Sequence, residues 1–358
     1  MTKSFSWVLL SLLMTAISCS SGNQDYKIAL VPSGSGQHGI FVMNADTTGG
    51  KLLTPDANAQ LRATSWSPDR RKILFLSFRS TDSEIMSKYR IPSHFPLYIM
   101  DASGSNQKRL LDFPVSSFSW SPDSRKLLFT SAFEDPAKDD LDVQRGVRAP
   151  MSAVYVLDLA TSTHKRITAF GQICSASWSP NGELIAISLG SNETADIYVV
   201  SLDGKVARRV TQSATMDIQP SWAPDGKTIA YLAVSPPGSN VEGAGVYVIK
   251  NDGTDNTRIS DIAAYDAIWS PDGKKLLILA SEGIYLLTLD GGKPIGLSNR
   301  SDRPLDAVFT PDGEKVMFRS NLEGEWGLYT IDLEGKNRTR ISGQLRPSYF
   351  CLSPLSAK

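Results

Sequence analysis

The sequence has few histidines and cysteines and no excess of either charge. Its 358 residues contain three His and three Cys, so we expect no metal centre built from several such ligands, and no cofactor. Lys and Arg together number 37, as do Asp and Glu, and no basic patch is interleaved with aromatics, which argues against nucleic acid as a partner. A G-x-S-x-G nucleophile elbow is also absent, which argues against a serine peptidase.

Long apolar runs are rare as well, and the one that occurs is N-terminal. It follows Lys3 and covers Phe5–Ile17, which is too short for a membrane-spanning helix and typical of a signal peptide. The run ends at Cys19 in the sequence AISC, which resembles the lipobox of bacterial lipoproteins. We therefore expect a signal peptide over residues 1–18, a lipidated Cys19 and a tether over residues 19–25, with ordinary secretory cleavage as the alternative. By the same resemblance, Ser20 implies a bacterial cell-envelope protein anchored in the outer membrane and facing the periplasm.

Removal of the signal peptide and lipidation of Cys19 would leave two thiols, Cys174 and Cys351. Both fall on predicted strands in different parts of the chain, so we expect two buried free cysteines and no disulfide.

One phrase, of the form W-S-P-D-G-K followed by apolar residues, recurs along most of the chain. The aromatic residues of successive copies are separated by 54, 58, 44, 47 and 40 positions. The aromatic positions are Trp66, Trp120, Trp178, Trp222, Trp269 and Phe309. A strand-rich unit with a period near 40 to 50 residues is typical of a β-propeller blade.

The wording of the phrase has a physical basis. Pro, Asp and Gly suit successive positions of a type I turn. The turn joins a strand ending in the aromatic residue to a second strand that is apolar on nearly every residue, as expected for a sheet covered on both faces. Third strands such as VYVLD and short fourth strands such as KRIT complete each unit. The sequence therefore predicts units of four antiparallel strands, with the aromatic packed between units.

The two ends of the chain determine the predicted number of units. Residues 28–31, 39–44 and 51–54 match the second, third and fourth strands of a unit that has no first strand, and Leu352-Ser353-Pro354 is a degenerate copy of the end of a first strand. Joining the two termini in one split blade removes exposed strand edges. We therefore expect an all-β, seven-bladed propeller over residues 26–358 as a single domain, with six blades as the alternative.

The W-S-P-D-G-K repeats resemble the propeller units of the TolB family. The resemblance covers roughly residues 26–354, whereas the α/β domain that precedes the propeller in that family is not expected here. It implies a monomeric, lipid-anchored envelope propeller that binds or scaffolds a protein or glycan. We expect it to touch the membrane only through its lipid, to bind no nucleic acid and to have no enzymatic activity.

Two long loops interrupt the repeat on one face of the predicted ring, at Phe78–Pro96 and Ala132–Ala153. Long loops on a rigid scaffold are where binding residues concentrate. The candidate binding residues in these loops are Arg79, Lys88, Tyr89, Arg90, His94, Phe95, Phe133, Asp139, Asp140, Arg145 and Arg148. A solvated loop pair without a ligand is the alternative.

A second candidate site lies at the predicted channel mouth. The residues expected to face inward on the first strands, with arginines nearby, are Arg62, Gln219, Asp266, Arg303, Asp306, Arg346 and Tyr349. They favour a small ligand or a peptide end, with plain channel lining as the alternative.

An enzyme is the alternative to a binding module. The repeats are also similar to propeller lyases acting on pectic sugars, which hold a metal through several His and a Gln. Here Gln37, His38 and His94 share the loop-rich face while His164 is expected on the opposite side, so no metal is expected. This alternative is a polysaccharide lyase or hydrolase with its site on the loop-rich face.

Overall fold

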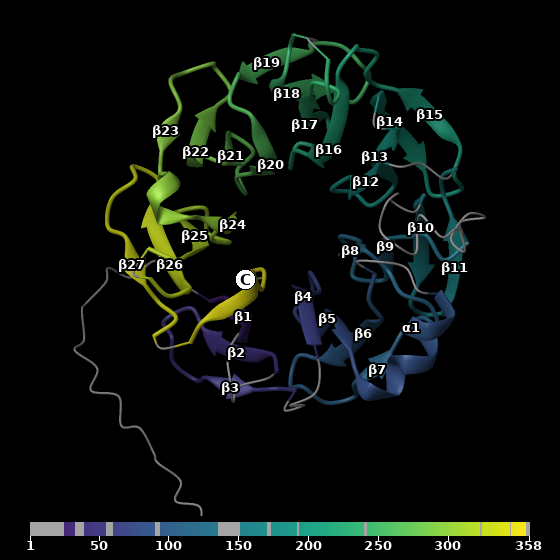
Figure 1. The fold of residues 1–358 in the computed structure, drawn as a ribbon, viewed down its shortest axis with the longest axis vertical. Helices are drawn as coiled ribbons and strands as arrows, with labels where there is room; N and C mark the ends of the chain where they lie inside the picture. Colours follow the sequence, from purple (N-terminus) through teal and green to yellow (C-terminus); the bar gives the residue numbers. More distant parts are fainter. Residues whose placement is uncertain are drawn as a thin grey trace, which may run out of the picture.

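The described part of the chain folds as a ring of antiparallel sheets around a central axis (Figure 1). The computed structural model describes residues 25–32, 39–54, 60–89, 94–134, 151–169, 173–191, 193–239, 242–322, 324–343 and 345–355. Cys19, Gln37, His38, Arg90, Asp139, Asp140, Arg145 and Arg148 lie outside these residues.

Five sheets contain four strands each. One sheet contains β4 (Gln60–Trp66), β5 (Lys72–Phe78), β6 (Leu97–Asp101) and β7 (Lys108–Arg109). The next contains β8 (Ser117–Trp120), β9 (Lys126–Ser131), β10 (Ala153–Asp158) and β11 (Thr163–Arg166). A third sheet contains β20 (Ala264–Trp269), β21 (Lys275–Ala280), β22 (Gly283–Thr288) and β23 (Ile295–Gly296). A fourth contains β24 (Leu305–Phe309), β25 (Lys315–Ser320), β26 (Gly327–Asp332) and β27 (Thr339–Arg340). In each, the first strand lies innermost and the fourth outermost (Figure 1).

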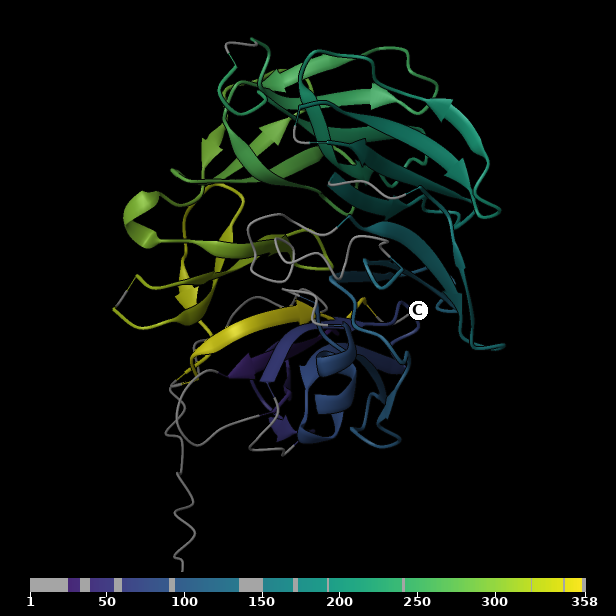
Figure 2. The same ribbon diagram turned by 45° about the vertical axis from the view of Figure 1, so that its right-hand side comes forward.

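The fifth four-stranded sheet joins the two ends of the described chain. Its order is β28 (Pro347–Leu352), β1 (Lys27–Pro32), β2 (Phe41–Asn44), β3 (Lys51–Leu52). The antiparallel pairing of β28 with β1 runs from Ile28 opposite Leu352 to Pro32 opposite Pro347. Figure 2 shows yellow β28 lying beside the purple N-terminal strands. This pairing closes the ring with strands from opposite ends of the sequence.

The predicted count of seven separate blades, or alternatively six, is wrong for the sheets that form. Five sheets within the described residues have four strands, and the remaining sheet has eight. Its strands are β12 (Ile173–Trp178), β13 (Leu184–Gly190), β14 (Ala195–Ser201), β15 (Val206–Arg209), β16 (Met216–Trp222), β17 (Thr228–Val234), β18 (Gly245–Lys250) and β19 (Thr257–Ser260). A parallel bridge between Ala195 and Met216 fuses its two halves. The repeat counts sequence units but does not reveal pairing across their boundary.

The repeated turn is held by the serine of the phrase as well as by Pro, Asp and Gly. In one copy, Ser270 donates its hydroxyl to Asp272 Oδ1 at 2.6 Å and accepts the backbone N–H of Lys275 at 2.9 Å. Gly273 closes the turn with an N–H bond to the Ser270 carbonyl at 2.9 Å, at a φ of 69° that favours glycine. Ser67, Ser121, Ser179 and Thr310 bond to the residue two positions later in the same way.

The repeated aromatics fill the contacts between neighbouring sheets. Their exposed fractions range from 5 to 8%. Trp269, at the end of β20, packs with Ala230 and Leu232 of β17 in the preceding sheet. Burying one large aromatic side chain stabilises a fold by about 1.5–3 kcal/mol, so these residues bind the sheets into one ring.

Helices are few and short in the part of the chain that the structure describes. They are two 3₁₀ turns, η1 (Ser80–Asp82) and η2 (Arg300–Asp302), and α1 (Ser83–Tyr89). None of the described helices has the length and apolar character that crossing a membrane would need.

Candidate functional site

Four innermost strands carry a β-bulge near their starts. The pairing register shifts around Arg62 of β4, around Gln219 of β16, around Tyr265 of β20 and around Asp306 of β24. All four side chains are exposed. The bulges lie at the end of the ring that also carries the loops between second and third strands. Because bulges re-aim side chains and are common beside active sites, we name Arg62, Gln219, Tyr265 and Asp306 the bulge residues.

Two bulge residues have a backbone conformation that is unusual for residues with a side chain. Gln219 has a φ of 56° and Asp306 a φ of 43°. Such left-handed conformations cost about 1–3 kcal/mol and concentrate at functional sites. The Gln219 N–H donates to Ser175 Oγ at 3.1 Å, which ties this bulge to the neighbouring inner strand.

Asp306 is held by an arginine from the adjacent strand. Arg319 of β25 pairs through Nη2 with Asp306 Oδ2 at 2.7 Å, and through Nη1 with the Pro347 carbonyl at 3.4 Å. The guanidinium also lies 5.3 Å from the Trp326 ring centre and 5.6 Å from that of Tyr349. Arg319 thus fixes the carboxylate, while Trp326, from the loop between β25 and β26 of the same sheet, and Tyr349 of β28 lie beside the arginine.

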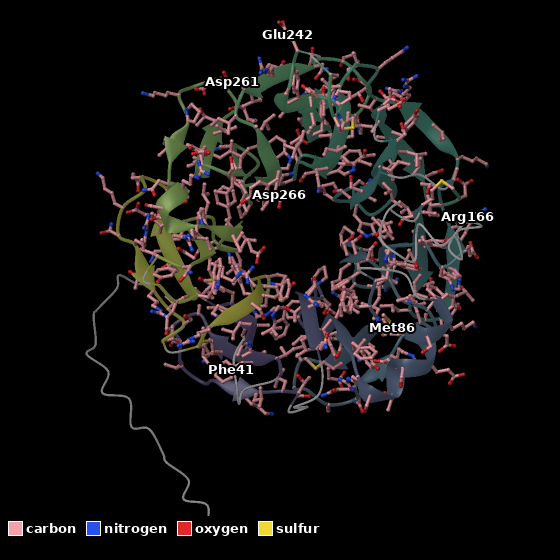
Figure 3. All side chains as sticks on the ribbon, in the orientation of Figure 1. Phe41, Met86, Arg166, Glu242, Asp261 and Asp266 are labelled. Atoms are coloured by element: carbon pink, nitrogen blue, oxygen red, sulfur yellow. The ribbon has the colours of Figure 1, made fainter. Side chains whose placement is uncertain are left out.

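Asp266 lies next to a bulge residue and belongs to the sheet that precedes Asp306. It is half-buried and accepts the Ala267 N–H at 2.8 Å. Figure 3 places it at the inner edge of the ring, whereas the labelled Phe41, Met86, Arg166, Glu242 and Asp261 lie toward the outside. Burial raises the pKa of Asp266, and the negative charge of Asp306 raises it further. This carboxyl therefore retains a proton to higher pH than an ordinary aspartate.

Tyr265 adds a hydroxyl to the same region. It is 47% exposed although it is a large aromatic residue. Burial of its hydroxyl raises the pKa of Tyr265, and the charges of Asp306 and Asp266 add to the effect. The phenol therefore remains a hydrogen-bond donor across the neutral range. The sequence did not single out Tyr265, because a bulge adds one residue and breaks the alternation that identifies inward-facing positions.

The sheet β28-β1-β2-β3, which we call the split sheet, lies between Arg62 of β4 and Asp306 of β24. Its guanidinium carbon is 5.1 Å from the centre of the Phe95 ring. Phe95 is fixed by an isolated bridge with Val115, with N–H to carbonyl distances of 2.8 and 2.9 Å in the two directions. The remaining predicted mouth residues are exposed: Arg303 ends η2 and Arg346 bonds to Glu325.

The described part of the loop predicted at Phe78–Pro96 contains α1, and several of its polar side chains are hydrogen-bonded. Arg79 donates to Gln107 Oε1 at 2.8 Å and lies 4.3 Å from the Tyr98 ring centre. Asp82 is fully buried and accepts the Tyr98 hydroxyl at 2.7 Å and Arg109 at 3.1 Å. These contacts make the loop a packed structure over the outer half of its sheet.

The other described candidates in the two long loops divide into exposed and packed residues. Lys88 lies over the Tyr89 ring at 5.0 Å on the exposed side of α1. His94 is only 4% exposed, so this candidate binding residue is buried. Phe133 stacks on Phe113 with a centroid distance of 3.6 Å, inside the cluster that joins two sheets.

Arginines of three fourth strands form ion pairs with acidic side chains. Arg109 pairs with Asp82, Arg166 with Glu134 at 3.3 Å, and Arg209 with Asp196 at 2.7 Å. Arg109 and Arg166 lie opposite tyrosines of their third strands in the sheet register. Each pair lies within one unit: the acid is in the loop before the third strand (Asp82, Glu134) or on the third strand itself (Asp196), 27, 32 and 13 residues before its arginine.

No metal centre forms among the described residues. No three or more His, Cys, Asp or Glu side chains within them are grouped to hold an ion.

The sequence profile described as the TolB beta propeller domain matches residues 86–283, which is just over half of the chain. The chain belongs to the TolB β-propeller family. Relatives include the Tol-Pal system protein TolB of Anaeromyxobacter dehalogenans, 30% identical over 129 residues, covering 35% of this chain and 26% of that protein. The TolB-like resemblance predicted from the repeats is therefore confirmed.

Other relatives of this TolB-family chain carry the names of enzymes. Dipeptidyl-peptidase 5 of Porphyromonas gingivalis is 25% identical over 304 residues, covering 71% of this chain and 42% of that protein. The uncharacterized peptidase YuxL of Bacillus subtilis is 26% identical over 146 residues, covering 40% of this chain and 21% of that protein. The chain thus spans about a fifth to two fifths of the length of these relatives.

Solved structures of the same fold include a lyase. An oligogalacturonate lyase in complex with manganese superposes with a TM-score of 0.62 at 16% identity, covering 82% of each chain. TolB from Acinetobacter baumannii superposes with a TM-score of 0.52 at 18% identity, covering 93% of this chain and 68% of that one. These similarities to peptidases and a lyase overturn the prediction of no enzymatic activity. That prediction rested partly on the absence of a G-x-S-x-G motif.

Proposed function

We propose that this TolB-family propeller is an enzyme that cleaves oligosaccharides by acid–base hydrolysis at the loop-rich end of its axis. The observation that carries the proposal is the pair Asp266 and Asp306. The two carboxyls interact electrostatically but have different surroundings: burial raises the pKa of Asp266, while Arg319 pairs with Asp306. Two carboxyl groups in different surroundings are the working parts of most glycosidases.

Each carboxyl has a role that follows from its contacts. Asp266 donates its proton to the glycosidic oxygen as the bond to the anomeric carbon breaks. Arg319 holds Oδ2 of Asp306, and Oδ1 accepts no hydrogen bond within the described residues. This oxygen takes a proton from the water whose oxygen bonds to the anomeric carbon. Protons balance because one leaves Asp266 and one arrives on Asp306.

Aromatic residues supply the surface on which sugar rings stack. The rings of Trp326, from the same sheet, and of Tyr349, from β28, lie 5.3 and 5.6 Å from the Arg319 guanidinium. Tyr265, next to Asp266 on β20, is exposed and retains its hydroxyl proton. Aromatic rings with a polar edge offer both an apolar face and a hydrogen-bond donor, which suits a sugar better than a flat protein surface.

The test is cleavage of a panel of neutral and acidic oligosaccharides by the full chain, measured as new reducing ends. Asp266→Asn and Asp306→Asn should each lower kcat at least about a hundredfold, as loss of a general acid or base does. Asp261→Asn, an exposed change toward the outside of the ring (Figure 3), should leave turnover unchanged. Turnover should fall as pH rises through the raised pKa of Asp266.

Two results would contradict the proposal. One is cleavage that survives Asp266→Asn. The other is release of p-nitroaniline from peptide p-nitroanilides without new reducing ends from any oligosaccharide, which would indicate a peptidase like the chain's peptidase relatives. Most of each peptidase relative lies outside its match to this chain.

A cell-envelope location is part of the proposal. The relationship to Tol-Pal system proteins supports it, as does the signal-like run before Cys19. Lipidation of Cys19 and outer-membrane anchoring are the finer expectations. Labelling with a radioactive fatty acid should be lost in Cys19→Ala, and retention of label in that variant would show that another residue is modified.

A further inference from the structure

The bulge residues present different chemical groups to the same end of the axis. Arg62 is the cation among them, and it is exposed. No acidic side chain pairs with Arg62 in the described part of the chain; its one contact of note is the Phe95 ring at 5.1 Å. Phe95 is itself fixed by its bridge to Val115. The guanidinium is therefore supported on one face while its donors remain available.

Arg319 provides the contrast. Its side chain is 13% exposed, and its guanidinium contacts a carboxylate, a carbonyl and two aromatic rings. Its positive charge is already balanced by Asp306. An anionic ligand would gain little there, because it would have to displace an ion pair. Arg62, whose charge has no counterpart, is the better anion-binding group.

Arg62 and the carboxyl pair are separated by an intervening sheet. The split sheet, with Tyr349 on β28, contacts β4 on one side, and its core includes Met317 and Leu328 of the Asp306-bearing sheet on the other. A ligand reaching from Asp306 to Arg62 must cross Tyr349. This order suits an oligomer better than a single sugar.

We infer that Arg62 binds a carboxylate of the substrate, so that the substrate class is an acidic oligosaccharide carrying uronic acids. The inference rests on the proposed function and deepens it. Arg62 is a specificity residue: it reads a carboxylate on a sugar remote from the bond that breaks. The planar fork of arginine matches both carboxylate oxygens at once.

Calorimetry can test this with a uronic-acid tetrasaccharide and its methyl-esterified form as probes. Asp266→Asn protein serves as background, so that binding is measured without turnover. The acidic form should bind about ten- to hundredfold more tightly than the ester, as expected for a charged hydrogen-bonded pair. Arg62→Gln should remove that preference while leaving affinity for the ester unchanged, and Arg62→Lys should restore part of it.

Arg71→Gln is the matched control, because it removes the same charge from an exposed turn at the opposite end of the ring. An unchanged acid-to-ester ratio in Arg62→Gln would overturn the inference, as would equal loss in Arg71→Gln. Failure of the proposed function is separate, since it would appear as absent cleavage by the unmodified chain. Preferential binding of an acidic peptide over both sugars would also overturn the inference.

Discussion

Trp269 donates its indole N–H to the backbone carbonyl of Ser221 at 3.0 Å. Ser221 directly precedes the Trp222 of the preceding unit, so Trp269 bonds back to the inner strand of the sheet before it. Trp120 makes the equivalent bond to Ser65 at 3.3 Å. Trp222, in contrast, has a buried indole nitrogen without a partner among the described residues. The repeat is therefore uniform in packing but not in hydrogen bonding.

This difference predicts unequal effects of the same substitution. Trp269→Phe should lower the free energy of unfolding by about 1–2 kcal/mol more than Trp222→Phe does, because only the first loses a hydrogen bond. Urea unfolding of the two variants measures the difference. Equal midpoints would show that the Trp269 bond contributes nothing to stability.

The turn serine makes a second prediction. Ser270→Ala removes the acceptor for the Lys275 N–H and a donor to Asp272, and should cost about 1–3 kcal/mol through the unsatisfied groups. Ser281→Ala is the control. This exposed serine follows β21, at the end of that strand away from the turn, and its substitution should be close to neutral. A thermal melt compares them, and matching Tm values would refute the turn network.

Asp266 makes stability depend on pH. Burial raises its pKa in the folded state above the unfolded value, so the folded state binds more protons and loses stability as pH rises through the raised pKa. Asp266→Asn should therefore raise Tm at pH 7, and the gain should vanish below about pH 3.9, the ordinary pKa of aspartate. A gain that is the same at both pH values would contradict this assignment.

Cys351 should be chemically inert in the folded protein. Burial raises the pKa of its thiol to about 12, and the sulfur lies 3.1 Å from Thr64 Oγ1. In a chain carrying Cys19→Ser and Cys174→Ser, a disulfide reagent at pH 8 should react at least about a hundredfold more slowly than in urea, because the thiolate is the nucleophile. Fast labelling under native conditions would mean that β28 opens readily.

The sequence predicts much of this fold because its repeat encodes local chemistry. Turn residues and one aromatic per unit determine hairpins and packing whatever their neighbours are, so residues such as Gly273 and Trp269 were interpretable in isolation. The parallel bridge between Ala195 and Met216 was not, since a single contact decides whether two sheets merge. Helix α1 was also missed, because seven residues carry too little periodicity to distinguish a helix from a loop.

The candidate site was predictable only in part. Asp266, Asp306 and Tyr349 emerged from counting back along the first strands, whereas Tyr265, Trp326 and Arg319 did not. Bulges shift the alternation by one residue, and Arg319 belongs to a second strand whose residues Val316–Phe318 are buried core. Side chains that meet across units leave no signature within a unit, so their convergence needs the three-dimensional arrangement.

The bridge that fuses two sheets also makes the ring mechanically uneven. On the opposite arc, β28 and β1 join only through pairing between the two ends of the chain, with no covalent hairpin turn to hold them. Force applied to the two ends of the chain would act first on the hydrogen bonds between β28 and β1, and the ring would open at that strand pair. The eight-stranded arc, continuous in sequence and bridged at Ala195, would be the last to come apart.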